Sequence, residues 1–408
     1  MRKRKLMHLA VTGALATIAA QNAFAGIGFK AGDWDLDFGG IVNGFYTYAD
    51  CQQPSATTAV GGGLACVGDK STSVRNGLLP GALVFSAKTR QNNLDVGVTI
   101  GLYPGINSNN NGPGGVNLAG GSPTALGTAG IDVRQTFFTF GDKSWGNFKI
   151  GRDIGIFASS AILSDMTLLG VGSSGGNVAP SNTSLGRIGI GYIYTDWLPQ
   201  ITYTSADLSG FQFQFGVFTP VVVLTDPSFG NQKQPQFQGG VSYSWKGDYA
   251  GKVWASAMTQ KQEQIAPGTA SYTGSAVDIG VKATFDIFEG VLYGYSGDGV
   301  GTTGLFILSN SAAGNKRKSD GGYAQGTVKF GDVKLGLSYG ESRLKLASGE
   351  VATGNTLVRK NKSAVGGVYY SLTKSITLVG EYTDTKAEAQ GGNSAKEKTL
   401  ALGGILFF

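Results

Sequence analysis

The strongest constraint on the fold is a two-residue alternation of side-chain type that returns along the chain. Residues 94–102 read LDVGVTIGL, with apolar side chains at the even positions and Asp, Gly or Thr at the odd ones. The same alternation recurs at residues 277–286 (VDIGVKATFD), 333–339 (VKLGLSY) and 376–382 (ITLVGEY). Because successive side chains of a β-strand point to opposite faces, each segment predicts a strand with one apolar face and one small or charged face.

Composition and strand spacing separate a membrane barrel from a soluble sandwich. The chain has 66 glycines and only 15% charged residues, against roughly 25% in soluble domains. The gaps between predicted strands alternate between a few residues and stretches of about eight to nearly thirty residues, as in outer-membrane barrels. We therefore predict an all-β fold, a transmembrane antiparallel β-barrel of about sixteen strands with an inward-folded constriction loop. The predicted strands are residues 34–48, 77–90, 94–103, 131–141, 146–156, 185–206, 211–219, 237–247, 250–260, 275–288, 291–296, 321–330, 332–345, 361–372, 375–387 and 396–408.

The N-terminus reads as a secretory signal peptide over residues 1–25. A basic run from Arg2 to Lys5 precedes an apolar stretch and the sequence Ala23-Phe24-Ala25. The apolar stretch is short for a retained anchor helix. Four of the 33 basic residues leave with the signal, so the mature chain, residues 26–408, carries 29 basic and 27 acidic residues, a net charge of +2. This balance predicts no nucleic-acid partner.

Histidine and cysteine usage narrows the chemistry of the mature chain. The only histidine, His8, lies in the signal peptide, so no Ser-His or Cys-His dyad and no histidine-based metal site can form. We predict no enzymatic activity, no metal and no cofactor. Cys51 and Cys66 are the only cysteines, and in an exported chain they predict one disulfide.

The stretch GRDIGIFASSAILSDMTLLGVG, residues 151–172, allows three interpretations. As a membrane helix it would place Asp165 in the span, at a cost of roughly 2.5–3.5 kcal/mol, and would interrupt a closed sheet. The pattern GVGSSG at residues 170–175 resembles a dinucleotide-binding turn, but NVAPSNTS follows it in place of a helix. The third interpretation is a loop, about residues 157–184, that packs apolar side chains on the inner wall of the barrel and turns Asp165 to the channel.

Four features in this order resemble the general porins of Gram-negative bacteria, the sixteen-stranded trimeric outer-membrane type. They are VRQTFFTFGDKSWGNFKIGRD at residues 133–153, the pair Asp165-Met166 in the inward loop, LGRIGIGYIY at residues 185–194, and a final alternating strand that ends at Phe408. The resemblance implies a cell outer-membrane location, contact with membrane lipid and a homotrimer. It also implies that Phe408 is a sorting signal for the barrel-insertion machinery.

The resemblance also implies a constriction site. Asp165 is expected to face Arg134 and Arg187 across the pore, where charges of opposite sign set ion preference. By alternation, Lys88 and Arg90 lie on the inward face of the second strand, nearer the periplasmic mouth.

Two departures from the best-known family members predict a weakly selective pore. Thr167, Leu168 and Leu169 follow Asp165 where those relatives usually carry a second acid, and Ile41 and Ala82 stand where they carry basic residues. Neutralising Asp165 is then expected to lower the relative permeability of cations.

Arg152 alternates to the outside of the barrel. Charge facing lipid costs up to roughly 2–4 kcal/mol at mid-membrane, and the trimer contacts of the family involve this strand. We therefore predict that Arg152 lies in a subunit interface.

These observations predict a water-filled channel for passive diffusion of ions and small hydrophilic solutes. The alternative is a substrate-specific channel, selective for anions or for one nutrient. A surface adhesin or an enzyme barrel belongs to another class, and the missing histidine argues against the enzyme.

Overall fold

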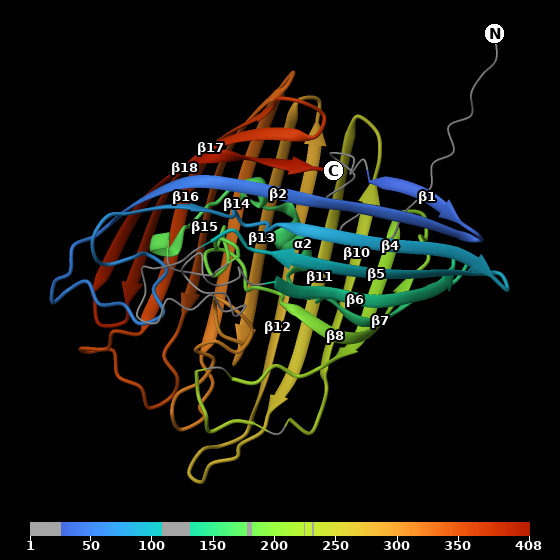
Figure 1. Cartoon of the computed structure of the whole chain (residues 1–408). Helices are drawn as coiled ribbons and strands as arrows, with labels where there is room; N and C mark the ends of the chain where they lie inside the picture. Colours follow the sequence, from blue (N-terminus) through green and yellow to red (C-terminus); the bar gives the residue numbers. More distant parts are fainter. Residues whose placement is uncertain (1–25, 108–130, 178–181, 224, 231) are drawn as a thin grey trace.

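The computed structural model describes residues 26–107, 131–177, 182–223, 225–230 and 232–408, so the predicted signal peptide lies outside the described residues. Of eighteen strands in one sheet, all except β1 and β3 close into a barrel of sixteen antiparallel strands, in which β18 pairs with β2 (Figure 1). The predicted fold class is confirmed. The strands are β1 Ile27–Ala31, β2 Trp34–Cys51, β3 Ser71–Arg75, β4 Ala82–Gln91, β5 Leu94–Pro104, β6 Ile131–Asp142, β7 Gly146–Ile154, β8 Trp197–Ser205, β9 Phe211–Phe218, β10 Gln236–Trp245, β11 Tyr249–Gln262, β12 Tyr272–Phe285, β13 Phe288–Asp298, β14 Lys318–Phe330, β15 Val333–Leu344, β16 Val358–Ser371, β17 Ile376–Ala389 and β18 Ser394–Phe407.

The predicted alternation holds along the strands. On β12 the side chains of Val277 and Ile279 are exposed, whereas Asp278 between them is buried inside the barrel. Leu337 on β15 is 73% exposed on the same outer surface. Since lipid covers the outer face of such a barrel, exposed apolar side chains there are favourable.

The second predicted strand, residues 77–90, begins only at Ala82 as β4, and a separate strand that was not predicted precedes it. Residues 71–75 form β3, which pairs with one half of β2, and β4 pairs with the other half. Proline cannot donate to a ladder, and Pro80 lies in the gap between them. The Asn43 side chain bonds to the gap, donating to the carbonyls of Leu79 and Pro80 and accepting from the Gly77 N–H.

The predicted strand 185–206 is wrong in its first half, because β8 begins only at Trp197. Gly186, Gly189 and Gly191 adopt positive φ angles of 55°, 72° and 139°, which fold residues 185–196 into compact turns. The alternating letters of this stretch therefore do not form an extended strand, and the loop inside the barrel is longer than expected.

The two ends of the barrel differ in the length of their connections. One end has short turns, including Asn92-Asn93 with φ angles of 48° and 65°, which suit a tight hairpin. The other end carries the long connections, except that β17 and β18 are joined by residues 390–393 alone, a shorter gap than predicted. We call these the short-turn end and the long-loop end. No helix among the described residues is long and apolar enough to cross a membrane.

Candidate functional site, the inward segment and the lumen

The described residues between β7 and β8, 155–177 and 182–196, lie inside the barrel, and we call them the inward segment. It contains the helix α2 (Ser159–Ser164) and the short 3₁₀ helices η1 (Met166–Leu169) and η2 (Gly175–Asn177). Phe157 and Ala161 are completely buried in a cluster with the wall residues Trp254 and Met258 of β11. Apolar contact with one wall therefore positions the start of the segment, as the sequence predicted.

Polar side chains of the wall bind the backbone of this segment. Gln238 of β10 accepts hydrogen bonds from the N–H groups of Ile156 and Phe157, at 2.7 and 2.8 Å. Asp278 of β12 accepts one from the Ala158 N–H at 3.0 Å. A non-helical backbone inside a barrel needs such partners for its polar groups.

The same arrangement continues on the strands that follow. Gln325 of β14 accepts from the Met166 N–H at 2.7 Å. Glu381 of β17 accepts from the N–H groups of Val171 and Gly172, at 2.7 and 2.8 Å, and from the Tyr369 hydroxyl at 2.6 Å. The inward segment is thus hydrogen-bonded to successive strands around half of the barrel.

Arg75 holds the opposite side of the segment, and sequence reasoning missed it. Its guanidinium is 1% exposed and donates to the carbonyls of Ser174 and Thr183, at 3.1 and 2.6 Å. Ile41 and Ala82 stand where the family resemblance implies basic residues, whereas Arg75 reaches the inner wall on β3, which lies outside the predicted strands. The alternation of STSVR at residues 71–75 could have indicated a strand. The sequence does not show, however, that this strand pairs with β2.

Asp165 does not face an open channel, contrary to the expectation. It is 4% exposed, and its carboxylate accepts from the N–H and the hydroxyl of Thr167, at 3.0 and 2.7 Å, and from the Tyr192 hydroxyl at 2.9 Å. Burial raises the pKa of the Asp165 carboxyl, and the nearby positive charge of Arg187 opposes that rise. The acid caps the first turn of η1 and stabilises the segment itself.

Arg187 is near Asp165, as expected, but on the inward segment and not on a strand. It is completely buried, and Nη1 donates to the carbonyl and hydroxyl of Ser363 on β16, at 3.3 and 3.2 Å. Burial lowers the pKa of the Arg187 guanidinium, and the charge of Asp165 opposes this. The two residues therefore form a buried electrostatic pair within the inward segment, and Arg187 also bonds the segment to the wall.

Arg134 is turned inward by a β-bulge. Gln135 pairs with Gly101 and Val133 with Leu102, so Arg134 is the extra residue between them. This bulge explains why Phe138 is exposed on the outer face although it shares the parity of Arg134.

The contacts of Arg134 lie within the wall and the inward segment. Its guanidinium is 2.7 Å from Asp132, donates to Asn182 at 3.2 Å and lies over the Tyr103 ring at 5.4 Å. The structure therefore brings Asp165 and Arg187 together and places Arg134 in a separate group of residues.

Lys88 and Arg90 are exposed on β4 near the short-turn end. Arg90 forms ion pairs of 2.6 and 2.7 Å with Asp95 and Asp142. Lys88 is the register partner of Asp35 on β2. Two carboxylates therefore offset the positive charge of Arg90, and a role of Lys88 and Arg90 in a constriction stays a prediction.

Two further predicted features, the disulfide and the C-terminal Phe408, lie at opposite ends of the barrel. The predicted disulfide joins Cys51 to Cys66, and the Cys66 N–H donates to Glu397 of β18 at 3.0 Å. Phe408 closes the last strand, where its carbonyl accepts from Gly40 at 2.8 Å. The disulfide prediction is confirmed, and the sorting role of Phe408 stays a prediction.

Arg152 is exposed on the outer face of β7, opposite Thr136 of β6. Its side chain therefore points out of the barrel, as the alternation predicted.

A lysine cluster on the inner wall is a feature that the sequence analysis did not single out. Lys252 is the register partner of Lys282, and Lys329 is the register partner of Lys334. These strand positions lie toward the short-turn end. In the described part of the chain, one ion pair involves the cluster, from Lys282 to Glu289 at 2.9 Å. Alternation had already put Lys282 on the inward face, but only the strand register shows the lysines side by side.

The glycine pattern at residues 170–175 does not form a nucleotide-binding turn. It connects η1 to η2 inside the barrel, and among the described residues only the three-residue η2 follows it, which is too short for such a turn. Among the described residues there is also no group of three metal-ligating side chains.

The family model for Gram-negative porins matches residues 10–390. The outer membrane channel DcaP of Acinetobacter baumannii is 17% identical over 93% of this chain and 99% of that one, with a TM-score of 0.68. An anion-selective porin from Comamonas acidovorans is 14% identical over 92% and 100%, with a TM-score of 0.59. OmpF of Salmonella typhi, in complex with daunomycin, is 12% identical over 94% and 100%, with a TM-score of 0.57. A search of curated protein sequences finds no match.

These solved structures share the closed barrel with this chain, and their low identity restricts that comparison to the fold. The family model, however, covers nearly the whole sequence. The chain belongs to the Gram-negative porin family and is an outer-membrane channel for the diffusion of solutes.

Proposed function

We propose that this channel passes small anions and anionic solutes more readily than cations of similar size. The observation that carries the proposal is the lysine cluster of Lys252, Lys282, Lys329 and Lys334 on the inner wall, with Glu289 as its paired carboxylate. Like charges directly opposite each other destabilise a sheet. Two such pairs on a water-filled face therefore favour a role in attracting anions.

The position of the cluster supports the same conclusion. Gly336 of β15 is next to Met166 of the inward segment, and Lys334 lies two residues nearer the short-turn end. Solutes that pass the segment on this side therefore meet the lysines next. Charge that lines a narrow passage selects ions by sign. Because Asp165 is buried, its charge does not contribute to the proposed anion preference.

Planar bilayers with the full chain test the proposal through the reversal potential in a KCl gradient. We expect the wild type to favour chloride, and the double substitution K252Q/K334Q to lower the chloride-to-potassium permeability ratio roughly two- to five-fold. In the described residues neither lysine has an ion pair within 4.0 Å, so no carboxylate loses its partner.

The matched control is K396Q/K398Q, which removes two exposed lysines from the outer face of β18 that also have no ion pair within 4.0 Å in the described residues. Equal changes in the two variants, or a wild type that favours potassium, would refute the anion preference. Saturation of the current by one anion would identify a substrate-specific channel, whereas a linear increase is expected for diffusion.

We further propose a homotrimer with β7 at the subunit interface. Arg152 is exposed on the outer face of β7, where a partner subunit would remove its charge from lipid. The substitution R152E is expected to convert the trimer to monomers on unheated gels, whereas R343E, also on the outer face, is expected to leave it intact. A stable R152E trimer would place the interface elsewhere.

A further inference from the structure

The backbone of η2 lies directly against the disulfide of Cys51 and Cys66, which closes residues 51–66 into what we call the disulfide loop. Gly176 of η2 has a φ angle of 66°, and a Cβ placed on it would be 2.7 Å from the Cys66 Cβ and 3.7 Å from the Cys51 Sγ. A carbon–carbon distance of 2.7 Å is shorter than van der Waals contact. The inward segment and the disulfide are therefore packed so closely that only glycine fits between them.

A buried carboxylate binds the disulfide loop and the inward segment at the same time. Glu397 of β18 is 1% exposed. One of its oxygens accepts a hydrogen bond from the Cys66 N–H at 3.0 Å, and the other accepts one from the Ser174 hydroxyl at 2.7 Å. Hydrogen bonds to a charged group are strong and directional, so a shift of Cys66 disturbs the carboxylate that Ser174 also uses.

The chain just after Cys66 supplies further contacts of η2. Ser71, the first residue of β3, donates from its hydroxyl to the Gly176 carbonyl at 3.0 Å. The Asn177 side chain donates to the carbonyl and the hydroxyl of Ser71, at 3.2 and 3.0 Å. Only residues 67–70 separate Ser71 from Cys66, and the ends of strands open readily. The position of Ser71, and with it that of η2, therefore depends on the disulfide.

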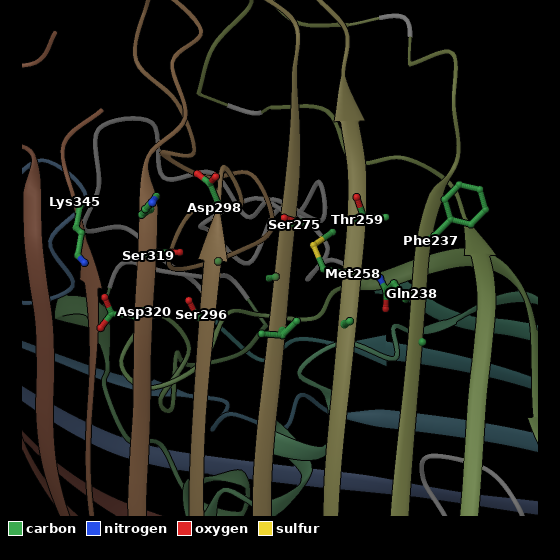
Figure 2. Close-up of a pocket in the computed structure, with 16 residues that line it drawn as sticks. Phe237, Gln238, Met258, Thr259, Ser275, Ser296, Asp298, Ser319, Asp320 and Lys345 are labelled. Atoms are coloured by element: carbon green, nitrogen blue, oxygen red, sulfur yellow. The ribbon is translucent and has the colours of Figure 1, made fainter. Parts of the chain in front are cut away.

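The first half of the inward segment is fixed to another part of the wall. Gln238 binds the backbone of Phe157, and Met258, its register partner on the next strand, belongs to the same apolar cluster as Phe157 (Figure 2 shows both wall residues). Release of the disulfide therefore frees η2 and leaves the first half in place. Because Ser174 is completely buried against β18, η2 can move only away from that wall and into the lumen. A segment that enters the lumen narrows the passage for solutes.

We propose that the disulfide is a redox-sensitive latch that holds η2 against the wall and so keeps the channel open. Two thiol groups of a reductant in the medium release the latch. The S–S bond breaks, each cysteine sulfur takes up one electron and one proton to become a thiol, and the two reductant sulfurs form a new S–S bond. Cys66 is half-buried and Val67 beside it is exposed, so a small thiol reaches the disulfide from the long-loop end.

Single wild-type channels in a planar bilayer test the proposal with dithiothreitol as the reductant. We expect the conductance to fall roughly twofold after reduction and to recover after oxidised glutathione restores the disulfide. Because the channels are inserted before the reductant is added, a folding defect cannot produce this result. Alkylation and mass spectrometry should find two modified cysteines after reduction and none before. The variant C51S/C66S should have the lower conductance from the start and should not respond to dithiothreitol.

Two further variants separate the latch from a general loosening of the loops. S71A/S174A keeps the disulfide but removes two contacts of η2, and it should lower the conductance without any reductant. The matched control is N393A, which removes a hydrogen bond of 3.1 Å from the Asn393 side chain to the Ala59 carbonyl of the disulfide loop. This bond joins the loop to the β17–β18 turn, so the conductance of N393A should equal that of the wild type.

A disulfide that dithiothreitol does not reduce, or a conductance that stays the same once both cysteines are alkylated, would overturn the proposal. S71A/S174A channels that conduct like the wild type would overturn it as well, because the disulfide would then not act through η2. An equal fall of conductance in N393A would attribute the effect to loosening of the loops. These conductances are independent of the proposed anion preference, which is measured as a permeability ratio.

Discussion

The hydroxyl of Tyr192 donates a hydrogen bond of 2.9 Å to the carboxylate of Asp165, and both residues are buried inside the barrel. Tyr192 is fully buried near the end of the inward segment, while Asp165 is the N-cap of η1 in the first third of the segment. This bond therefore ties two parts of the segment together. The one acid in an apolar run serves the structure of the loop, although the sequence pointed to a charge exposed to the channel.

Substitution of Asp165 should change stability more than selectivity. In D165N the buried Arg187 loses its nearby negative charge, and hydrogen bonds to a charged group are worth about 1.5–3 kcal/mol. We expect faster amide hydrogen exchange over residues 155–177 and a lower melting temperature, while the reversal potential stays near that of the wild type. The control is D332N, in an exposed turn at the short-turn end. A large change of selectivity in D165N would show that Asp165 lines the permeation path.

Removal of Glu381 should release the middle of the inward segment. E381A leaves the N–H groups of Val171 and Gly172 without their acceptor, at a cost of about 1–3 kcal/mol for each buried group. We expect loss of exchange protection at residues 170–177 and larger current fluctuations in single channels. The control T383A lies on the same strand and removes a buried hydroxyl that has no hydrogen-bond partner among the described residues. Equal effects of the two variants would show that this carboxylate does not hold the segment.

The disulfide should stabilise the long-loop end. Cys51 and Cys66 are 15 residues apart, and closing a loop of that length stabilises a fold by about 3 kcal/mol. C51S/C66S should therefore melt at a lower temperature than the wild type, and a reductant should lower the wild-type melting temperature to that of the variant. The same reductant should have no effect on C51S/C66S, and an effect there would show that it acts elsewhere.

The loop between β15 and β16 should detach in acid. The guanidinium of Arg317 donates hydrogen bonds to Glu350, one of them at 2.9 Å, and these bonds lower the pKa of the Glu350 carboxyl. Because the folded pKa is below the unfolded one, the stabilisation is present above the ordinary glutamate pKa of about 4.3 and is lost as the pH falls through the folded pKa. Protection factors of residues 345–357 should stay constant from pH 7 to pH 5 and fall below pH 4.

E350Q provides the control for this titration. It should show the low protection at every pH, because the amide cannot carry the charge that Arg317 binds. A fall in wild-type protection between pH 7 and pH 5 would attribute the change to another group.

Much of the barrel could be predicted because a strand in lipid has a local signature. The period of two, seen in Val277 and Ile279 around Asp278, follows from the geometry of one strand and needs no knowledge of its neighbours. The same locality explains the error at residues 185–196. That stretch alternates in sequence, but glycines with positive φ fold it into turns, and its contacts lie on distant strands.

The candidate site was less predictable because its residues act through pairs that are far apart in the chain. Asp165 and Arg187 lie close together, as expected. Whether their charged groups contact protein or water depends on how tightly the inward segment packs, and the sequence does not show this. Arg75, Gln238 and Glu381 bind backbone groups of the segment, and no spacing in the sequence marks such an acceptor or donor.

By itself, the sequence determined an exported all-β membrane chain, its inner and outer faces, its disulfide and the loop folded into its lumen. The tertiary structure decided that the acid of this loop is buried, that Arg134 turns inward at a bulge, and that lysines of neighbouring strands lie side by side. The physical reason is that strand faces depend on each residue's nearest neighbours in the chain. Charge pairing, in contrast, depends on the register between strands, and burial depends on packing across the lumen.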